Sequence, residues 1–320
     1  MALVFTAISN AWCTLFLWHE LRGEGLDLRD PVLWKQAIAV ALISTGLYGF
    51  GMTLNDIIDR RRDQQLAAHR PLPSGRVGVG TAHIIAGLLF TMALVCSFLF
   101  ERWSNDGWMS IVLVVWTATL IIFYDLAAKY LVALGLLSLG LIRFFHAVIP
   151  APGLPLLWHP LLLLNHVTVL SLVGYWWEEK RPVLTPLHWA AVPGGLVAID
   201  ALLIGLLALR RGPQADSLVE ALLIRPSLAL PAGAVVAFIL LGWIIRDRSA
   251  TPREAGQRLM LYGLLWLIAY DACFAAAYVS FAAAGVLLAL LPMAYLSVQL
   301  MRWWSGLIAL SQRPAFKRAE

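Results

Sequence analysis

The feature that most constrains this chain is a series of long apolar runs. Each has about 20 mostly apolar residues, the length that an α-helix needs to cross a bilayer. They lie near residues 2–19, 32–54, 78–100, 108–126, 130–149, 155–176, 186–209 and 228–245. The stretch from Leu259 to Leu300 is apolar for about twice that length, so we expect a helical hairpin with its turn at Gly285. The runs predict an all-α fold, a polytopic membrane bundle of about nine to ten transmembrane helices.

Composition agrees with this reading. Hydrophobic residues make up 60% of the 320 residues and charged residues only 13%, about half the charged fraction of an average globular chain. The net charge of +5 would be compatible with nucleic-acid binding in a soluble protein, but the basic residues lie in short loops. We therefore expect one membrane domain over residues 1–320, with membrane lipid around it and no nucleic-acid partner.

The distribution of Lys and Arg predicts the orientation of the bundle. These residues concentrate in the loops after the even-numbered apolar runs and in the C-terminal tail, which contains Arg313, Lys317 and Arg318. Cytoplasmic loops carry an excess of Lys and Arg. We expect these loops and the tail on the cytoplasmic side of a bacterial-type inner membrane.

A dense polar segment, NDIIDRRRD at residues 55–63, follows the second apolar run. On a continuing helix, Asn55, Asp59 and Asp63 lie on one face, with Asp56 within three residues of Asp59. Carboxylates gathered in this way repel one another unless a cation joins them, and Mg²⁺ prefers such hard oxygen ligands and leaves positions for phosphates. We expect these four residues to bind Mg²⁺. The alternative is a solvated, charge-balanced helix end.

The longer stretch NDIIDRRRDQQLAAHRPLPSG, at residues 55–75, closely resembles the first aspartate-rich motif of the UbiA superfamily of intramembrane prenyltransferases. The resemblance implies an all-helical bundle around a central cavity. It also implies Mg²⁺-dependent transfer of a prenyl group from a prenyl diphosphate to a hydrophobic or aromatic acceptor. On this basis Asp56, Asp59 and Asp63 are expected to be catalytic, and Asn55 and Arg70 to bind substrate.

Four further residues resemble positions of the same family. Tyr124 and Lys129 are similar to a tyrosine and a lysine of the family's fourth loop, where the lysine meets the diphosphate. Asn10 in the first span resembles a polar residue that faces the cavity. Arg143 lies in a glycine-rich fifth span similar to that of one bacterial branch. The resemblance implies substrate contacts for all four residues.

Charged residues at membrane depth are costly and are usually functional. From the residues alone, Arg143 has two readings: it binds a phosphate, or it pairs with a buried acid. Asp200 and Asp271 lie in later spans. Each is a candidate partner of Arg143, a site for an acceptor proton, or a hydrogen-bonded structural acid.

The chain departs from the family at the second aspartate-rich motif, expected after the sixth span. Glu178, Glu179 and Lys180 stand there, with no DxxD or DxxxD. We expect Glu178 to replace the aspartate as a catalytic metal ligand and Lys180 to bind substrate; a loop salt bridge is the alternative. Adjacent helical residues diverge by about 100°, so only one glutamate faces the site. The altered motif is similar to that of the UbiA-like branch associated with ebo-type gene clusters.

The altered motif leaves a second function open. A non-catalytic isoprenoid- or lipid-binding component, or a transport component, would keep the fold after losing one metal site. An ordinary ion-coupled transporter would have paired broken helices and an internal repeat, and neither is evident in the sequence.

Overall fold

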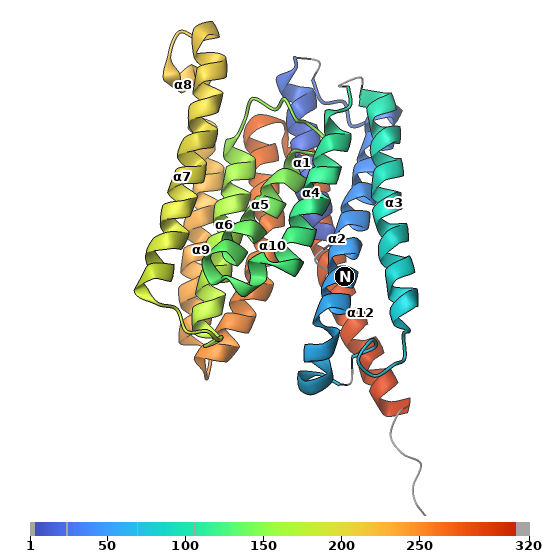
Figure 1. Ribbon diagram of the computed structural model, residues 1–320. Helices are drawn as coiled ribbons and strands as arrows, with labels where there is room; N and C mark the ends of the chain where they lie inside the picture. The colour runs from blue at the N-terminus through green and yellow to red at the C-terminus, as the bar shows by residue number, and fades with distance from the viewer. Residues whose placement is uncertain (1–3, 24, 69, 105–106, 312–320) are drawn as a thin grey trace, which may run out of the picture.

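The computed structural model is an all-helical bundle (Figure 1) and describes residues 4–23, 25–68, 70–104 and 107–311. The basic tail residues Arg313, Lys317 and Arg318 lie outside the described residues. The α-helices are α1 Val4–Leu21, α2 Pro31–Leu66, α3 Val79–Ser104, α4 Met109–Leu126, α5 Val132–Val148, α6 Trp158–Trp177, α7 Pro186–Arg211, α8 Leu218–Ala221, α9 Ala229–Asp247, α10 Pro252–Tyr278, α11 Phe281–Leu288 and α12 Leu290–Ser311. Short 3-10 turns are η1 Ala128–Tyr130, η2 Gly212–Gln214 and η3 Pro226–Leu228.

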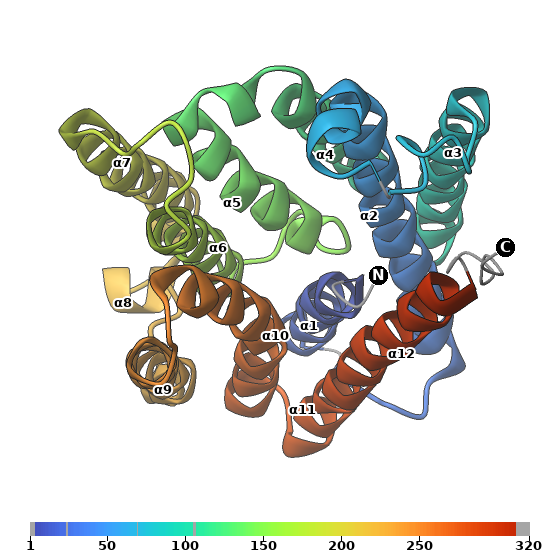
Figure 2. The same ribbon diagram turned by 90° about the horizontal axis from the view of Figure 1, so that it is seen from below.

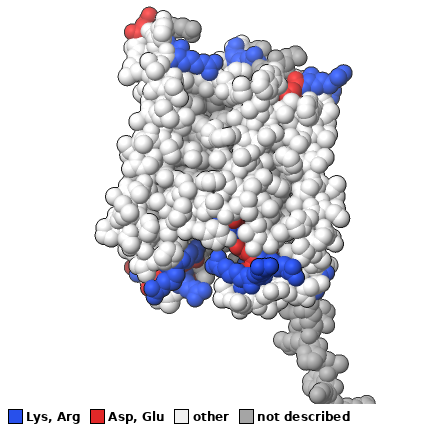
Figure 3. Space-filling model, in the orientation of Figure 1, with Lys and Arg blue, Asp and Glu red and all other residues white. Residues whose placement is uncertain are grey.

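The prediction of a polytopic membrane bundle is confirmed. Within the described residues, 8 helical segments are long and apolar enough to cross a membrane. Two further helices complete the set expected from the apolar runs: α1, with 18 residues, and the apolar α5, with 17. Figure 3 shows Lys and Arg gathered at the two ends of the molecule, with a wide band between them that is almost free of charge.

The helices form a ring with α1 inside it (Figure 2). α1 packs against α2, α5, α10, α11 and α12, and its residues from Thr6 to Ala11 are buried. In contrast, α7 and α9 lie at the outside of the ring (Figure 2). Only 17% and 11% of the most apolar stretch of their spans is buried.

α2 carries the acidic motif beyond the apolar band. Its start is fixed by Asp30, whose side chain accepts a hydrogen bond from the Val32 N–H, and by Pro31 in the first turn. With 36 residues, α2 is about 54 Å long, whereas the hydrocarbon core of a bilayer is about 30 Å thick. The last turns of α2 therefore project past the membrane core and hold the motif at the lower end of the molecule in Figure 1.

The expected hairpin turn at Gly285 is wrong. The chain breaks at Val279 and Ser280, between α10 and α11. The Ser280 side chain accepts a hydrogen bond from the Ala283 N–H and so caps α11. Gly285 lies inside the eight-residue α11 with open space where a Cβ would stand. A capping serine, not a glycine, sets the boundary.

Close packing of α5 on α6 depends on Gly140. A Cβ at this position would lie 2.7 Å from the Leu164 carbonyl oxygen and would also collide with the Thr168 hydroxyl. The helices pack at a distance that excludes any side chain at this position. Because α5 also carries Arg143, this contact sets the position of that residue in the bundle.

We expect Gly140→Ala to destabilise the protein by about 1–3 kcal/mol, because a backbone oxygen cannot give way and the two helices must separate. Gly285→Ala is the matched control and should stabilise it slightly, by about 0.5–1 kcal/mol, since Ala is the better helix former and the space is open. Unfolding in mild detergent measures both. Equal stability of the two variants would contradict the packing described for α5 and α6.

Candidate active site

A cavity of about 390 Å³ lies between α1, α2, α4, α5, α6 and α10. α2 contributes a stripe that follows helical periodicity and begins and ends with polar residues: Ser44, Leu47, Tyr48, Gly51, Met52 and Asn55. The middle of the wall is apolar, with Ile121, Leu139 and Ile142 opposite the stripe. The cavity therefore has an apolar body between two polar ends.

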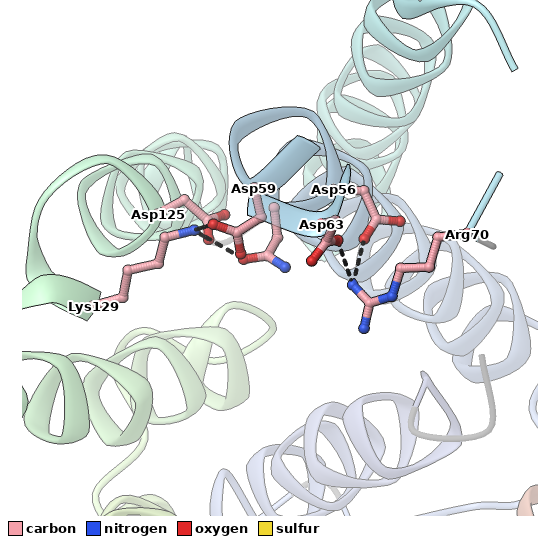
Figure 4. Close-up of polar contacts among 7 residues, drawn as sticks. Asp56, Asp59, Asp63, Arg70, Asp125 and Lys129 are labelled. Atoms are coloured by element: carbon pink, nitrogen blue, oxygen red, sulfur yellow. Dashed lines mark hydrogen bonds and ion pairs between the residues drawn. The ribbon is translucent and has the colours of Figure 1, made fainter. Parts of the chain in front are cut away.

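The outer polar end is organised by Lys129, which follows α4 in η1. Its ammonium donates hydrogen bonds to Asn55 Oδ1 at 3.1 Å and Asp59 Oδ1 at 2.9 Å. Asp125, one turn before Lys129, lies 3.6 Å away. Figure 4 shows α2 and α4 presenting these groups to one ammonium. The side-chain oxygens of three residues thus converge on one mostly buried ammonium at the cavity mouth.

The other two motif acids turn to a different cation. Arg70 Nη1 lies 2.6 Å from Asp63 Oδ2 and 3.9 Å from Asp56 Oδ1 (Figure 4). Arg70 lies in the loop after α2, so the chain folds back to reach its own helix. The four motif residues therefore form two pairs, Asn55 with Asp59 and Asp56 with Asp63, each on its own cation.

A buried polar network lies behind the inner end of the cavity. Arg143, which lines the cavity, donates to Asn10 Oδ1 at 3.2 Å. The Asn10 amide donates to Asp271 Oδ2 at 2.7 Å, and Asp271 Oδ1 lies 2.7 Å from His159 Nε2. Asn10, Asp271 and His159 are fully buried. Of the readings left open for Asp271, the structure supports a hydrogen-bonded structural acid, because its carboxylate contacts Asn10 and His159 and reaches Arg143 only through Asn10.

Residues 25–163 match the model of the UbiA prenyltransferase family. The UbiA resemblance is confirmed. The match spans the acidic motif, Lys129 and Arg143. No curated protein matches the chain.

One solved structure, described as digeranylgeranylglyceryl phosphate synthase in membranes, matches with a TM-score of 0.55 and 16% identity. It covers 86% of this chain and 94% of that one. At this identity the match concerns the fold. The shared fold covers more of the chain than the segment that the family model matches.

The altered second motif lies apart from the cavity lining. Glu178 ends α6, pairs with Lys180 at 3.1 Å and packs on α10 at Gly256. Lys180 lines a separate hollow of about 510 Å³ that also includes Trp177 and Arg246. The loop salt bridge left open above is present. A metal-binding role for Glu178 stays a prediction.

The remaining expected site residues divide between the two ends of the cavity. Tyr124 lines it beside Asp125, and Arg143 lines it further in. Asp200, the other candidate partner of Arg143, instead accepts two hydrogen bonds from Asn165, at 2.9 and 3.0 Å. Asp200 is a structural acid between α6 and α7.

Sequence reasoning missed several participants in this site. Asp125 could have been added, because it stands four residues before Lys129 on the same helical face. His159 gives no such signal, since it is separated from Asp271 by more than a hundred residues of chain. The same holds for Ser44 and His146, whose side chains meet at 3.0 Å in the cavity wall.

We expect Lys129→Met to destabilise the protein by about 3–5 kcal/mol, because it leaves Asp59 and the buried Asp125 without their cation. Arg70→Met is the matched control. Arg70 is 49% exposed, so losing its ion pairs should cost only about 0–1 kcal/mol. Unfolding of the purified protein measures both. Similar losses in the two variants would show that the Lys129 cluster is as well solvated as the Arg70 cluster.

Proposed function

We propose that this protein transfers a prenyl group from a prenyl diphosphate to a hydrophobic or aromatic acceptor inside the membrane, with Mg²⁺ bound at the first motif. The observation that carries the proposal is the cavity itself. An apolar body that suits an isoprenoid opens at a mouth where acids and cations alternate. The UbiA family match over residues 25–163 supports the same reaction class.

The donor chemistry of the mouth fits a hard divalent cation. The oxygens of Asn55, Asp59 and Asp125 already surround one cationic group, and Asp56 is half exposed at the opening. Asn55, Asp56, Asp59 and Asp63 would hold Mg²⁺, consistent with its preference for carboxylate and amide oxygens. When bound, it would neutralise part of the charge of the diphosphate.

Lys129 and Arg70 are the groups that would bind the diphosphate oxygens. Each stands among acids at the mouth, so its position is held before substrate arrives. Charge-assisted hydrogen bonds of this kind are strong. Preorganised cations favour a transition state in which negative charge builds up on a leaving diphosphate. In this proposal the ammonium of Lys129 turns from Asn55 and Asp59 to the diphosphate.

The apolar wall has a separate role. Loss of diphosphate leaves an allylic carbocation, which water would capture. Leu47, Ile121 and Leu139 offer no nucleophile, and a closed apolar surface excludes water from the reacting carbon. The chain would thus direct the cation to the acceptor.

We also propose that the motif end of the bundle faces the cytoplasm, across a bacterial-type inner membrane. The loops richest in Lys and Arg are at this end, as the positive-inside rule predicts for the cytoplasmic side.

A second candidate function is a non-catalytic isoprenoid- or lipid-binding component. Two observations favour it. Glu178 is engaged by Lys180 outside the cavity lining, and the motif acids already have internal cations. A fold that binds an isoprenoid without reacting would have these properties.

The deciding experiment uses the purified protein in lipid nanodiscs with radiolabelled geranyl, farnesyl and geranylgeranyl diphosphates and a bacterial lipid extract. A labelled lipid product that forms with Mg²⁺ and not with EDTA supports prenyl transfer. Saturable binding of a labelled diphosphate without any product supports the binding component.

We expect Asp59→Asn to abolish Mg²⁺-dependent binding of the prenyl diphosphate, because the substitution removes one of the carboxylates that would hold Mg²⁺. Calorimetry with and without Mg²⁺ measures it. Asp200→Asn makes the same change away from the cavity and should leave binding within about twofold of wild type, as its partner is Asn165. Unchanged binding in Asp59→Asn would remove Asp59 from the metal site.

We expect Glu178→Gln to lower turnover at least about tenfold, equivalent to about 1.4 kcal/mol, if Glu178 serves as a metal ligand in the working enzyme. Glu179→Gln is the matched control, because Glu179 lies beyond the end of α6 with a positive φ and lines the separate hollow, and it should keep near-normal turnover. Equal turnover in both variants would leave Glu178 with its salt bridge to Lys180 as its only role.

A further inference from the structure

A hollow of about 510 Å³ opens at the motif end of the bundle, and it shares no lining residue with the central cavity. Its wall comes from the end of α6, the loop to α7, the first turns of α7 and α10 and the last turn of α9. These segments meet at the lower end of the molecule in Figure 1. The volume is in the range of pockets that bind small molecules, about 300–1,000 Å³.

The turn that follows α6 holds one wall of this hollow in place. Glu179 takes a left-handed conformation with a φ of 51°. The Glu179 N–H donates to the Trp176 carbonyl, and the Lys180 N–H donates to the Tyr175 carbonyl, which is the Schellman pattern of a helix end. The Tyr175 hydroxyl then donates to the Pro182 carbonyl at 2.7 Å. These bonds fix the loop before any ligand binds.

Three cations line the hollow: Lys180, Arg181 and Arg246. Lys180 pairs with Glu178 at 3.1 Å, and the acid that lines the hollow is Glu179. Among the described residues, no carboxylate lies within ion-pair distance of either arginine. Figure 3 shows basic side chains gathered at this end of the molecule. Two guanidinium groups are therefore left to bind an anion.

Tryptophan side chains form another part of the wall. Trp176 of α6 and Trp189 of α7 meet edge to face, with ring centroids 5.6 Å apart. The Arg246 guanidinium carbon lies 5.9 Å from the centroid of the Trp177 ring, within cation–π range. Tryptophan is enriched where a membrane meets water, because its ring is amphipathic. The hollow therefore lies at the level of the lipid headgroups.

The surface beside the hollow is apolar and exposed. On α9, Trp243 stands three residues before Arg246, on the same face of the helix, and is 73% exposed. On the other side, Val183 and Leu187 are 59% and 73% exposed. A molecule in the hollow thus touches cations at one end and continues onto surface that faces acyl chains. This combination suits a lipid better than a soluble anion.

We propose that the hollow binds the headgroup of an anionic phospholipid from the leaflet at this end of the bundle. Its phosphate lies against Arg181 and Arg246, because guanidinium groups form paired, charge-assisted hydrogen bonds with phosphate oxygens. Its glycerol backbone packs on Trp176 and Trp189, and its acyl chains follow the exposed faces of α7 and α9. The site is separate from the proposed prenyl transfer and does not depend on it.

The test is native mass spectrometry of the full-length protein in detergent, titrated with dioleoyl phosphatidylglycerol and dioleoyl phosphatidylcholine. The two lipids share their acyl chains and phosphate, and only phosphatidylglycerol carries a net charge. We expect the wild type to bind the first molecule of phosphatidylglycerol at least about tenfold more tightly, since each arginine near an anionic headgroup contributes about fivefold.

Arg181→Gln combined with Arg246→Gln should reduce this preference to about twofold or less. Each single variant should lose about fivefold, which decides the matter if the double variant fails to fold. Arg248→Gln combined with Arg253→Gln is the matched control. It removes the same charge from the same helix ends, at exposed positions outside the hollow, and should keep the wild-type preference.

Equal affinity of the wild type for the two lipids would overturn the inference. So would a preference that survives in the double variant, or one that falls equally in the control pair, because general attraction to a basic surface would then explain it. Inorganic phosphate and sn-glycerol 3-phosphate should not displace phosphatidylglycerol. Displacement by either at a concentration similar to that of the lipid would assign the hollow to a soluble phosphate instead.

Discussion

The structure depends on how the protein stabilises charged side chains in surroundings that cannot solvate them. A buried charge is tolerated only when paired or hydrogen-bonded, and the hydrocarbon core supplies neither water nor counter-ions. The molecule meets the constraint in two ways. At the mouth, Lys129 is surrounded by oxygens from α2 and α4. Further in, Arg143 is linked to Asp271 only through Asn10. Carboxylates compensate the charge of Lys129, whereas the hydrogen-bond partner of Arg143 is the neutral side chain of Asn10.

α2 connects these two arrangements. Its length carries the acids beyond the membrane core, and the same helix lines the cavity from Ser44 to Asn55. A rigid helix of this kind keeps the separation of the two polar ends constant. Two of the helices that pack on it, α1 and α4, also line the cavity. The site is thus built on regular elements, with Arg70 as the main contribution from a loop.

The sequence was a good guide to local features. Apolar runs predicted the spanning helices, and the i, i+4 spacing predicted that Asn55 and Asp59 share a face. The sequence-based prediction failed where a single side chain sets a helix boundary. Ser280 ends the α10 segment by capping α11, whereas helical breaks are commonly expected at glycine, and Gly285 misled the prediction.

The sequence also did not predict the division of the motif acids into two pairs. This division depends on the return path of the loop that carries Arg70, and no spacing rule describes that path. The buried network of Asn10, His159 and Asp271 joins α1, α6 and α10 across most of the chain. Such contacts follow from tertiary packing, which periodicity within one helix does not encode.

Because α7 and α9 lie at the outside of the ring, the folded protein depends on contacts with lipid. Most of their apolar surface has no protein neighbour among the described residues, so acyl chains must supply the contacts that a further layer of helices would give in a soluble protein. The lipid annulus on this side is then part of the tertiary structure. Since α6 and α10 lie directly beneath these two helices, the choice of lipid or detergent acts on two walls of the cavity.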